Sequence, residues 1–310
     1  MKNTFTFCSI AFSLSTLFAQ QQLGNSNMEA WENIGAATEE PTNWNGFKSA
    51  SGGLAGFASQ QVTRSTAIRS GASGTYCARI WSKSILGIVA NGTLTLGRIN
   101  MGSTTVTDIS ANYNISLTND PNFSETLGSL PDSIVFWAKY TAAQGQLARI
   151  NALVHDAFDV HDPIDVASSS HVLATATLNY PPNANWVRYS VPFMPYAFTG
   201  TAPLPQYMLV TFATNNIPGG GAANDEVLLD DIQLIYNSNV GIEELNSTFY
   251  THYSIENGLI ISGGDSSYEV FNLSGQLLKQ GSETELNGLK LNSGIYIVKS
   301  STSSKKVLVP

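Results

Sequence analysis

Short segments in which apolar and polar residues alternate run along most of the chain. Examples are residues 132–141 (DSIVFWAKYT), 171–180 (HVLATATLNY) and 207–214 (YMLVTFAT), which are rich in β-branched and aromatic residues and are separated by stretches containing Gly, Pro, Asn and Asp. A period of two is typical of β-strands, and no long stretch has the period of a helix. The pattern predicts an all-β fold, a jelly-roll β-sandwich, over residues 20–237.

A second set of strands with tight turns follows residue 248. In YSIENGLIIS the turn falls at Asn257-Gly258, and in YEVFNLSGQLLKQG it falls at Ser274-Gly275. Such pairs suit hairpins, since Gly adopts a positive φ without strain. We expect a small Ig-like β-sandwich over residues 248–310, joined to the first domain by a linker at residues 238–247.

The last strand of the first domain, EVLLDDIQLIY, carries two aspartates in its middle. Strict alternation places Asp230 on one face with Ile232 and Leu234, and places Asp231 on the other face. An ionised carboxylate on an apolar face is costly unless it is paired, hydrogen-bonded or bound to a metal. The candidates for compensating Asp230 are backbone amides, an arginine such as Arg79 or Arg188, and a cation.

The N-terminal residues, MKNTFTFCSIAFSLSTLFAQQQ, combine Lys2 with an apolar run that ends at Ala19. This arrangement indicates a secretory signal peptide over residues 1–19, so the mature chain is expected to begin at Gln20. Cleavage removes Cys8 and leaves Cys77 alone, which excludes an internal disulfide. No later segment is long and apolar enough to predict a transmembrane helix.

The balance of charges narrows the range of partners. The chain has 15 basic and 23 acidic residues, a formal net charge of −8, and no basic cluster. Such a chain is not expected to bind nucleic acid or anionic lipid. The low charge content and the many turn residues are typical of an extracellular β-rich protein, so we expect it to be secreted and to act at the outer cell surface or outside the cell.

Four features stand in a fixed order near the C-terminus. They are residues 270–275 (VFNLSG), Leu289, residues 293–299 (SGIYIVK) and the pair Lys305-Lys306. In this order they resemble the type A sorting domain of proteins that Bacteroidetes export by the type IX secretion system. The Asn-Pro pair usual near the start of that domain is missing. The resemblance implies export by the type IX translocon, cleavage by a sortase, and attachment to surface lipopolysaccharide or release.

The two ends of the first domain carry a further set of matching positions. These are Asn25, Met28, Glu29, Trp44 and the pair Asp230-Asp231. They resemble carbohydrate-binding jelly rolls, in which the first and last strands lie close together and often hold a structural calcium. The resemblance implies a calcium site with Glu29, Asp230 and Asp231 as ligands. Carboxylates and backbone carbonyls are the ligands that calcium prefers.

The stretch from residue 132 to residue 236 contains DSIVFWAKYT, NWVRYSVPF and the acidic last strand in succession. In this succession it resembles the "putative carbohydrate metabolism domain" family of Bacteroidetes surface proteins. The resemblance implies a jelly roll and a role connected with sugars.

The densest group of candidate chemical side chains is VHDAFDVHDPID, residues 154–165. Its carboxylates, Asp159 and Asp162 among them, suit a metal or sugar hydroxyls, and glycoside hydrolysis needs two carboxylates. A solvated turn is the simpler interpretation, because Asp and Pro favour turns. Trp81 and Trp186 are the candidate aromatic platforms for a sugar ring.

Three functions stay open from the sequence. A non-catalytic carbohydrate-binding or adhesion module is favoured, because no nucleophile motif such as GxSxG occurs. A glycoside-active enzyme that uses carboxylates of the 155–165 loop is the first alternative. A structural surface protein without a sugar ligand is the second.

Overall fold

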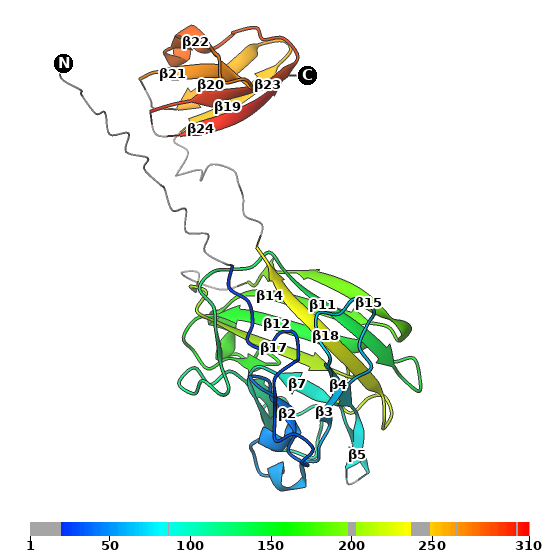
Figure 1. The fold of residues 1–310 in the computed structure, drawn as a ribbon. Coiled ribbons are helices and arrows are strands. Elements are labelled where there is room, and N and C mark those ends of the chain that lie inside the picture. Colours follow the sequence, from blue (N-terminus) through cyan, green and yellow to red (C-terminus); the bar gives the residue numbers. More distant parts are fainter. Residues whose placement is uncertain are drawn as a thin grey trace, which may run out of the picture. The chain divides into compact units, whose positions relative to one another are not determined.

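The computed structural model describes residues 20–85, 87–197, 203–236, 249–263, 266–301 and 303–309. The chain forms two compact units, Met1–Asn237 and Ser238–Pro310, each with its own hydrophobic core. Figure 1 shows the strands of both units. The expected signal peptide, residues 1–19, and the expected linker, residues 238–247, lie outside the described residues.

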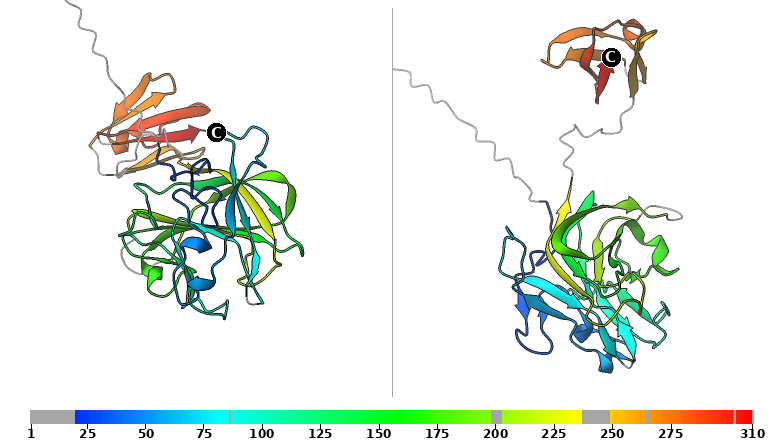
Figure 2. Two further views of the ribbon diagram at one scale, coloured as in Figure 1. Left: turned by 60° about the horizontal axis from the view of Figure 1, so that its bottom comes forward. Right: turned by 90° about the vertical axis from the view of Figure 1, so that its right-hand side faces the viewer.

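Two antiparallel sheets build the N-terminal unit. The five-stranded sheet has the order β15 (Asn183–Pro192), β11 (Ser133–Thr141), β18 (Glu226–Ile235), β4 (Cys77–Trp81) and β3 (Val62–Ser65). The six-stranded sheet has the order β10 (Glu125–Thr126), β17 (Tyr207–Ala213), β12 (Ala148–His155), β14 (Val172–Tyr180) and β16 (Met194–Pro195), with β7 (Thr93–Thr95) paired to β17. Figures 1 and 2 show these layers, which confirm the predicted jelly-roll β-sandwich.

The core of this unit lies between the two sheets and follows the alternation of the long strands. Ile150, Ala152 and Val154 of β12 point inward and are fully buried. From the opposite sheet, Phe136 meets Phe212 edge-on, with the ring centroids 5.1 Å apart. Burial of one such large apolar side chain contributes roughly 1.5–3 kcal/mol. The same alternation sends the intervening side chains of β12 to the outer face of its sheet.

Short elements border the sheets. They are β1 (Trp31–Glu32) and β2 (Glu40–Pro41), the hairpin of β5 (Lys83–Ile85) and β6 (Ile88–Ala90), the three-stranded sheet of β8 (Arg98–Met101), β9 (Asn112–Ile115) and β13 (His161–Asp162), and the 3-10 turns η1 (Phe47–Ser49), η2 (Ala55–Phe57) and η3 (Ser168–Ser170). Isolated bridges pair Asn45 with Thr95 and Ser51 with Asn100. They bring the segment with η1 and η2 beside β7 and β8.

A β-bulge in β18 changes which face Asp230 occupies. Asp231 has a φ of 44°, and the pairing of β18 with β11 shifts at this point. The extra residue of a bulge reverses the alternation beyond it. The core therefore takes Val227 and Leu229 before the bulge and Ile232 and Leu234 after it. The expectation that Asp230 shares a face with Ile232 and Leu234 was wrong, because Asp230 lies on the outer side of the sheet.

The C-terminal unit is a smaller sandwich, as the hairpin pattern predicted. One sheet pairs β19 (Phe249–Ser254) with β20 (Gly258–Gly263), and the other has the order β22 (Leu277–Gly281), β21 (Tyr268–Asn272), β23 (Gly294–Lys299) and β24 (Ser304–Val309). The helix α1 (Glu283–Leu286) adds Leu286 to the core, where Phe249 and Tyr268 meet edge-on. Gly258 and Gly275 adopt φ values of 73° and 76° in the expected turns. In the described part of the chain, no helix is long and apolar enough to span a membrane.

Candidate functional site

A cavity of about 260 Å³ opens on the outer face of the six-stranded sheet. Its floor consists of Arg149 and Asn151 from β12 and Thr211 and Ala213 from β17. These side chains point away from the core because their neighbours in each strand point into it. The regular alternation of two central strands therefore determines where the polar floor lies.

Hydrogen bonds hold Asn151 in place on this floor. Asn151 Nδ2 donates to Asp162 Oδ1 at 2.7 Å, and Thr177 Oγ1 donates to Asn151 Oδ1 at 2.5 Å. Arg149 Nη2 lies 3.9 Å from Asp162 Oδ1, and its side chain is 32% exposed. Asp162 is 5% exposed. The floor thus combines the guanidinium of Arg149 with the amide of Asn151, which Asp162 and Thr177 hold in place.

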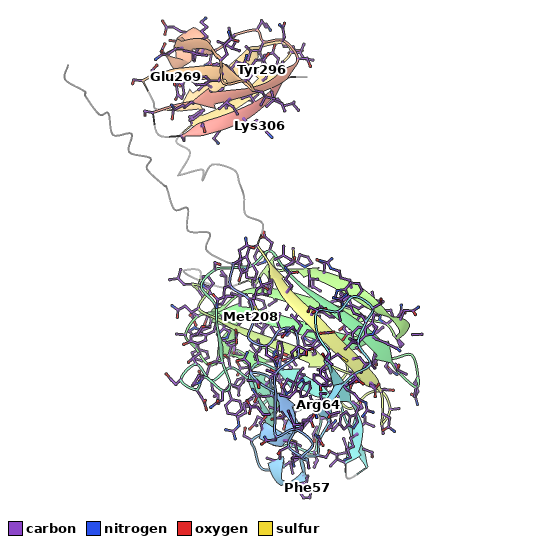
Figure 3. All side chains as sticks on the ribbon, in the orientation of Figure 1. Phe57, Arg64, Met208, Glu269, Tyr296 and Lys306 are labelled. Carbon is purple, nitrogen blue, oxygen red and sulfur yellow. The ribbon has the colours of Figure 1, made fainter. Side chains whose placement is uncertain are left out.

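Apolar side chains from four separate segments form the walls of the cavity. They are Phe47, Leu54 and Phe57 around η1 and η2; Ile85, Ile88 and Val89 of the β5–β6 hairpin; Ile99 and Met101 of β8; and Val106 and Ile109 of the segment that follows β8. Phe57 is 52% exposed and Ile109 is 46% exposed. Figure 3 shows Phe57 at the surface of the unit. The cavity combines a polar floor with an apolar mouth.

The carboxylates of the loop that contains residues 155–165 bind protein groups, some within the loop and some on neighbouring segments. Asp159 accepts hydrogen bonds from the backbone N–H and the hydroxyl of Thr118, at 2.8 and 2.7 Å. Asp165 accepts from the backbone N–H of Ser168 at 2.8 Å and lies 3.0 Å from His161 Nδ1. Asp159 does not line the cavity, whereas Asp162 is the only carboxylate among the lining residues that the structure describes.

His155 is fully buried beside this loop. Burial lowers the pKa of its imidazole to about 4, so the ring is neutral at pH 7. Nδ1 lies 2.7 Å from the carbonyl oxygen of Asp156, so in the neutral ring this nitrogen carries the proton. The ring stacks on Tyr207, with the centroids 5.8 Å apart. His155 is therefore a fully buried packing residue, and it does not line the cavity.

Trp81 and Trp186, the aromatic residues singled out from the sequence, lie on β4 and β15 of the other sheet. Both are half-buried, and neither lines the cavity. The guanidinium of Arg79 lies over the Trp81 ring, 4.6 Å from its centroid. The aromatic residues that do line the cavity are Phe47, Phe57 and Tyr113.

Asp230 is buried, with 2% of its surface exposed. Its Oδ1 accepts the backbone N–H of Asp231 at 2.8 Å, while its Oδ2 has no hydrogen-bond partner among the described residues. Burial, together with the neighbouring carboxylate of Asp231, raises the pKa of Asp230 to about 7. Neither Arg79 nor Arg188 forms an ion pair with it in the described structure, since Arg79 pairs with Glu226.

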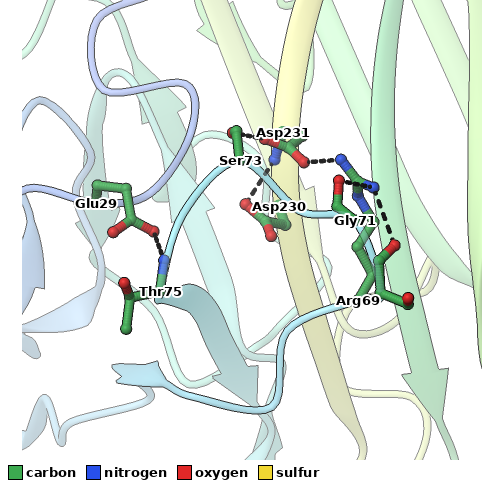
Figure 4. A network of polar contacts seen from close by, with 8 residues as sticks. Glu29, Arg69, Gly71, Ser73, Thr75, Asp230 and Asp231 are labelled. Carbon is green, nitrogen blue, oxygen red and sulfur yellow. Dashed lines mark hydrogen bonds and ion pairs between the residues drawn. The ribbon is translucent and has the colours of Figure 1, made fainter.

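Figure 4 shows Glu29 and the two aspartates around the loop from Arg69 to Thr75. Glu29 Oε1 accepts the backbone N–H groups of Thr75 and Tyr76, both at 2.8 Å. Asp231 forms an ion pair with Arg69 and accepts a hydrogen bond from Ser73 Oγ at 2.8 Å. Within the described ranges, no three His, Cys, Asp or Glu side chains are grouped closely enough to hold a metal ion.

A second cavity, of about 420 Å³, lies on the outer face of the five-stranded sheet. Trp137 and Arg188, cross-strand partners on β11 and β15, line it together with Arg69 and Asp231. The Arg69 guanidinium lies over the Trp137 ring, 4.6 Å from its centroid. Because the chain itself covers this aromatic ring, the first cavity is the stronger candidate for a ligand site.

Comparison with known proteins gives a likeness of fold. No family model matches the chain. No curated protein matches it significantly in sequence. A "putative glycoside hydrolase" from Bacteroides thetaiotaomicron superposes with a TM-score of 0.52 at 14% identity, covering 71% of this chain and 72% of that one.

Two further solved structures superpose with lower scores. A "putative glycoside hydrolase" from Bacteroides vulgatus gives a TM-score of 0.48 at 16% identity over 66% of this chain and 89% of that one. A family 11 carbohydrate-binding module of a Clostridium thermocellum cellulase gives 0.31 at 12% identity over 67% and 95%. At these identities the likeness concerns the fold.

Proposed function

We propose that the N-terminal jelly roll binds carbohydrate, without turnover, in the cavity on the outer face of the six-stranded sheet. The observation that carries the proposal is the polar floor of Arg149, Asn151 and Thr211 beside apolar walls. Sugars present hydroxyl groups along their edges and C–H groups on their faces. Small-molecule sites likewise combine apolar linings with a few polar groups that fix orientation.

The chemistry of the lining favours binding over hydrolysis. Glycoside hydrolysis needs two carboxyl groups about 5–9.5 Å apart, one on each side of the bond that breaks. Asp162 is the one carboxylate that lines the cavity in the described structure, and it is bound to Asn151. A glycoside-active enzyme is the second candidate, since the first fold neighbour is described as a "putative glycoside hydrolase".

An array of plant and bacterial polysaccharides tests both candidates with the chain that begins at Gln20. The proposal predicts retention of at least one glycan without release of shorter products, and weaker retention by Asn151→Ala. Asn179→Ala, an exposed change on β14 outside the cavity, is the matched control. Release of sugars that Asp162→Asn abolishes would establish the enzyme instead. Retention of no glycan would leave a structural surface protein.

We also propose that calcium compensates Asp230. Asp230 Oδ2 is a buried oxygen without a described partner, and Glu29 is a nearby carboxylate that raises the pKa of Asp230. These two residues fit a cation, whereas Asp231 does not, because Arg69 and Ser73 occupy its oxygens. Calcium takes six to eight oxygen ligands, so backbone carbonyls and water would supply the others.

For the C-terminal unit we propose a type IX sorting domain, on the strength of its sequence resemblance. The protein would then be secreted, meet the translocon and the sortase, and end on surface lipopolysaccharide or outside the cell. Deleting residues 238–310 should leave the protein in the periplasm of its host. Normal display at the surface after this deletion would contradict the assignment.

A further inference from the structure

We infer that the cavity receives a short O-acyl group carried by its glycan, with the ester carbonyl held at the polar floor. The inference rests on the proposed function. It comes from a mismatch between the walls of the cavity and the needs of an unsubstituted sugar ring.

The walls of the cavity are mainly aliphatic. A pyranose ring packs best on the flat face of an aromatic side chain, and three aromatic residues line the cavity in the described structure. One of them, Tyr113, is already stacked on His161, with the ring centroids 3.9 Å apart. Met101 and seven branched aliphatic side chains complete the walls; the seven are Leu54, Ile85, Ile88, Val89, Ile99, Val106 and Ile109. These branched side chains surround a narrow alkyl group better than they support a flat ring.

The size of the cavity points to a small occupant. Its volume of about 260 Å³ lies just below the roughly 300–1,000 Å³ of sites that enclose drug-sized ligands. A chain of several sugar rings would not fit inside it. A single substituent, with its parent sugar at the mouth, does fit this volume.

The floor supplies the polar half of an ester. Arg149 has five N–H donors, and its contact with Asp162 is long, at 3.9 Å. Asn151 is held by Asp162 and Thr177 and cannot turn. Arg149 can therefore donate to the carbonyl oxygen of an ester while the alkyl end lies against Ile99 and Val106. The ester itself is neutral, and a charged group in its place would be costly against these apolar walls.

The test uses paired glycan arrays. O-acetylated plant and bacterial polysaccharides are printed before and after mild alkali, which removes O-acyl esters and leaves the glycosidic chain. The chain that begins at Gln20 should bind at least one untreated glycan at least tenfold more tightly than its treated copy. Burial of one methyl group accounts for about fourfold, and the carbonyl hydrogen bond for the rest.

A pair of variants locates the effect. Ile109→Asn changes a wall residue that is 46% exposed, so the fold should tolerate it, and it should remove the preference for untreated glycan. Val166→Asn, at a position that is 93% exposed and outside the lining, should keep the preference. Equal binding to both copies of every glycan overturns the acyl inference and leaves the proposed function standing. Binding to neither copy contradicts the proposed function itself, and the inference with it.

Discussion

The charge of Asp230 couples the stability of the sandwich to pH. Its folded-state pKa of about 7 is higher than the value of about 4 for an unfolded chain. Between these two values the folded state binds more protons than the unfolded state, so stability falls as pH rises. The full contribution is present below about pH 4 and is lost as pH rises through 7.

Asp230→Asn removes this titration and keeps the shape of the side chain. In the absence of metal, the free energy of unfolding of the wild type should fall relative to that of the variant as pH rises from 5 to 8. The expected fall is a few kcal/mol, because each unit of pKa shift corresponds to about 1.4 kcal/mol. Urea unfolding of both proteins with a chelator present measures the difference. An identical pH dependence in the two proteins would show that Asp230 stays ionised.

Ionisation of Asp230 lowers the stability of the fold, whereas calcium bound to the ionised carboxylate should raise it. At about a hundredfold excess over the dissociation constant, a bound ion adds roughly 2.7 kcal/mol to the free energy of unfolding. We expect this gain at pH 8 in the wild type and not in Asp230→Asn, as read from the melting temperature with and without calcium. A matched variant, Asp231→Asn, should keep the response, because Asp231 pairs with Arg69. A wild type that does not respond to calcium would end the metal proposal.

At the scale of single residues, the sequence singled out Asp162, which lines the cavity, but not the polar floor on which the proposed site depends. The alternation of apolar and polar residues alone predicts only that Arg149 and Asn151 lie on the solvent-facing side of a strand. Asp230 was placed on the wrong face because a bulge at a positive-φ aspartate leaves no clear mark in the sequence. The partners of a polar side chain depend on long-range pairing, which one sequence does not specify.

At the scale of elements, hydrogen bonds to Thr118, between β9 and β10, anchor the loop between β12 and β14. Asp159→Ala removes two of them, both to Thr118, and should lower the free energy of unfolding by about 1–3 kcal/mol. Glycan binding should survive in the folded protein, since Asp159 lies outside the lining. Urea unfolding measures the first effect and an array the second. If folded Asp159→Ala loses glycan binding, Asp159 belongs to the ligand site after all.

The long strands could be predicted and the short ones could not. β11, β12, β14 and β18 have eight to ten residues each, enough for the alternation of apolar and polar side chains to be recognised. Among the elements that wall the cavity, β5 and β6 have three residues each and β8 has four. Such elements form because their neighbours supply partners, so the segments that wall the cavity stayed undefined in the sequence.

At the scale of the whole molecule, each hydrophobic core is drawn from its own unit. A chain that starts at Gln20 and ends at Asn237 should therefore fold alone. Its midpoint of urea unfolding should equal that of the same unit in a chain that continues to residue 310. Near-ultraviolet circular dichroism during unfolding, which reports the packing of its buried aromatic rings, measures this. A clearly lower midpoint would mean that residues 238–310 stabilise the sandwich.

The cavity on the six-stranded sheet is tested most directly by equilibrium titration of one glycan retained on the array. Two arginine variants are compared with the wild type: Arg149→Gln on the cavity floor and Arg188→Gln on the opposite sheet. Loss of a hydrogen bond from a charged donor costs about 1.5–3 kcal/mol. We therefore predict a dissociation constant at least tenfold higher for Arg149→Gln and an unchanged one for Arg188→Gln. Unchanged affinity in Arg149→Gln, with affinity lost in Arg188→Gln, would contradict this site and move it to the other face of the sandwich.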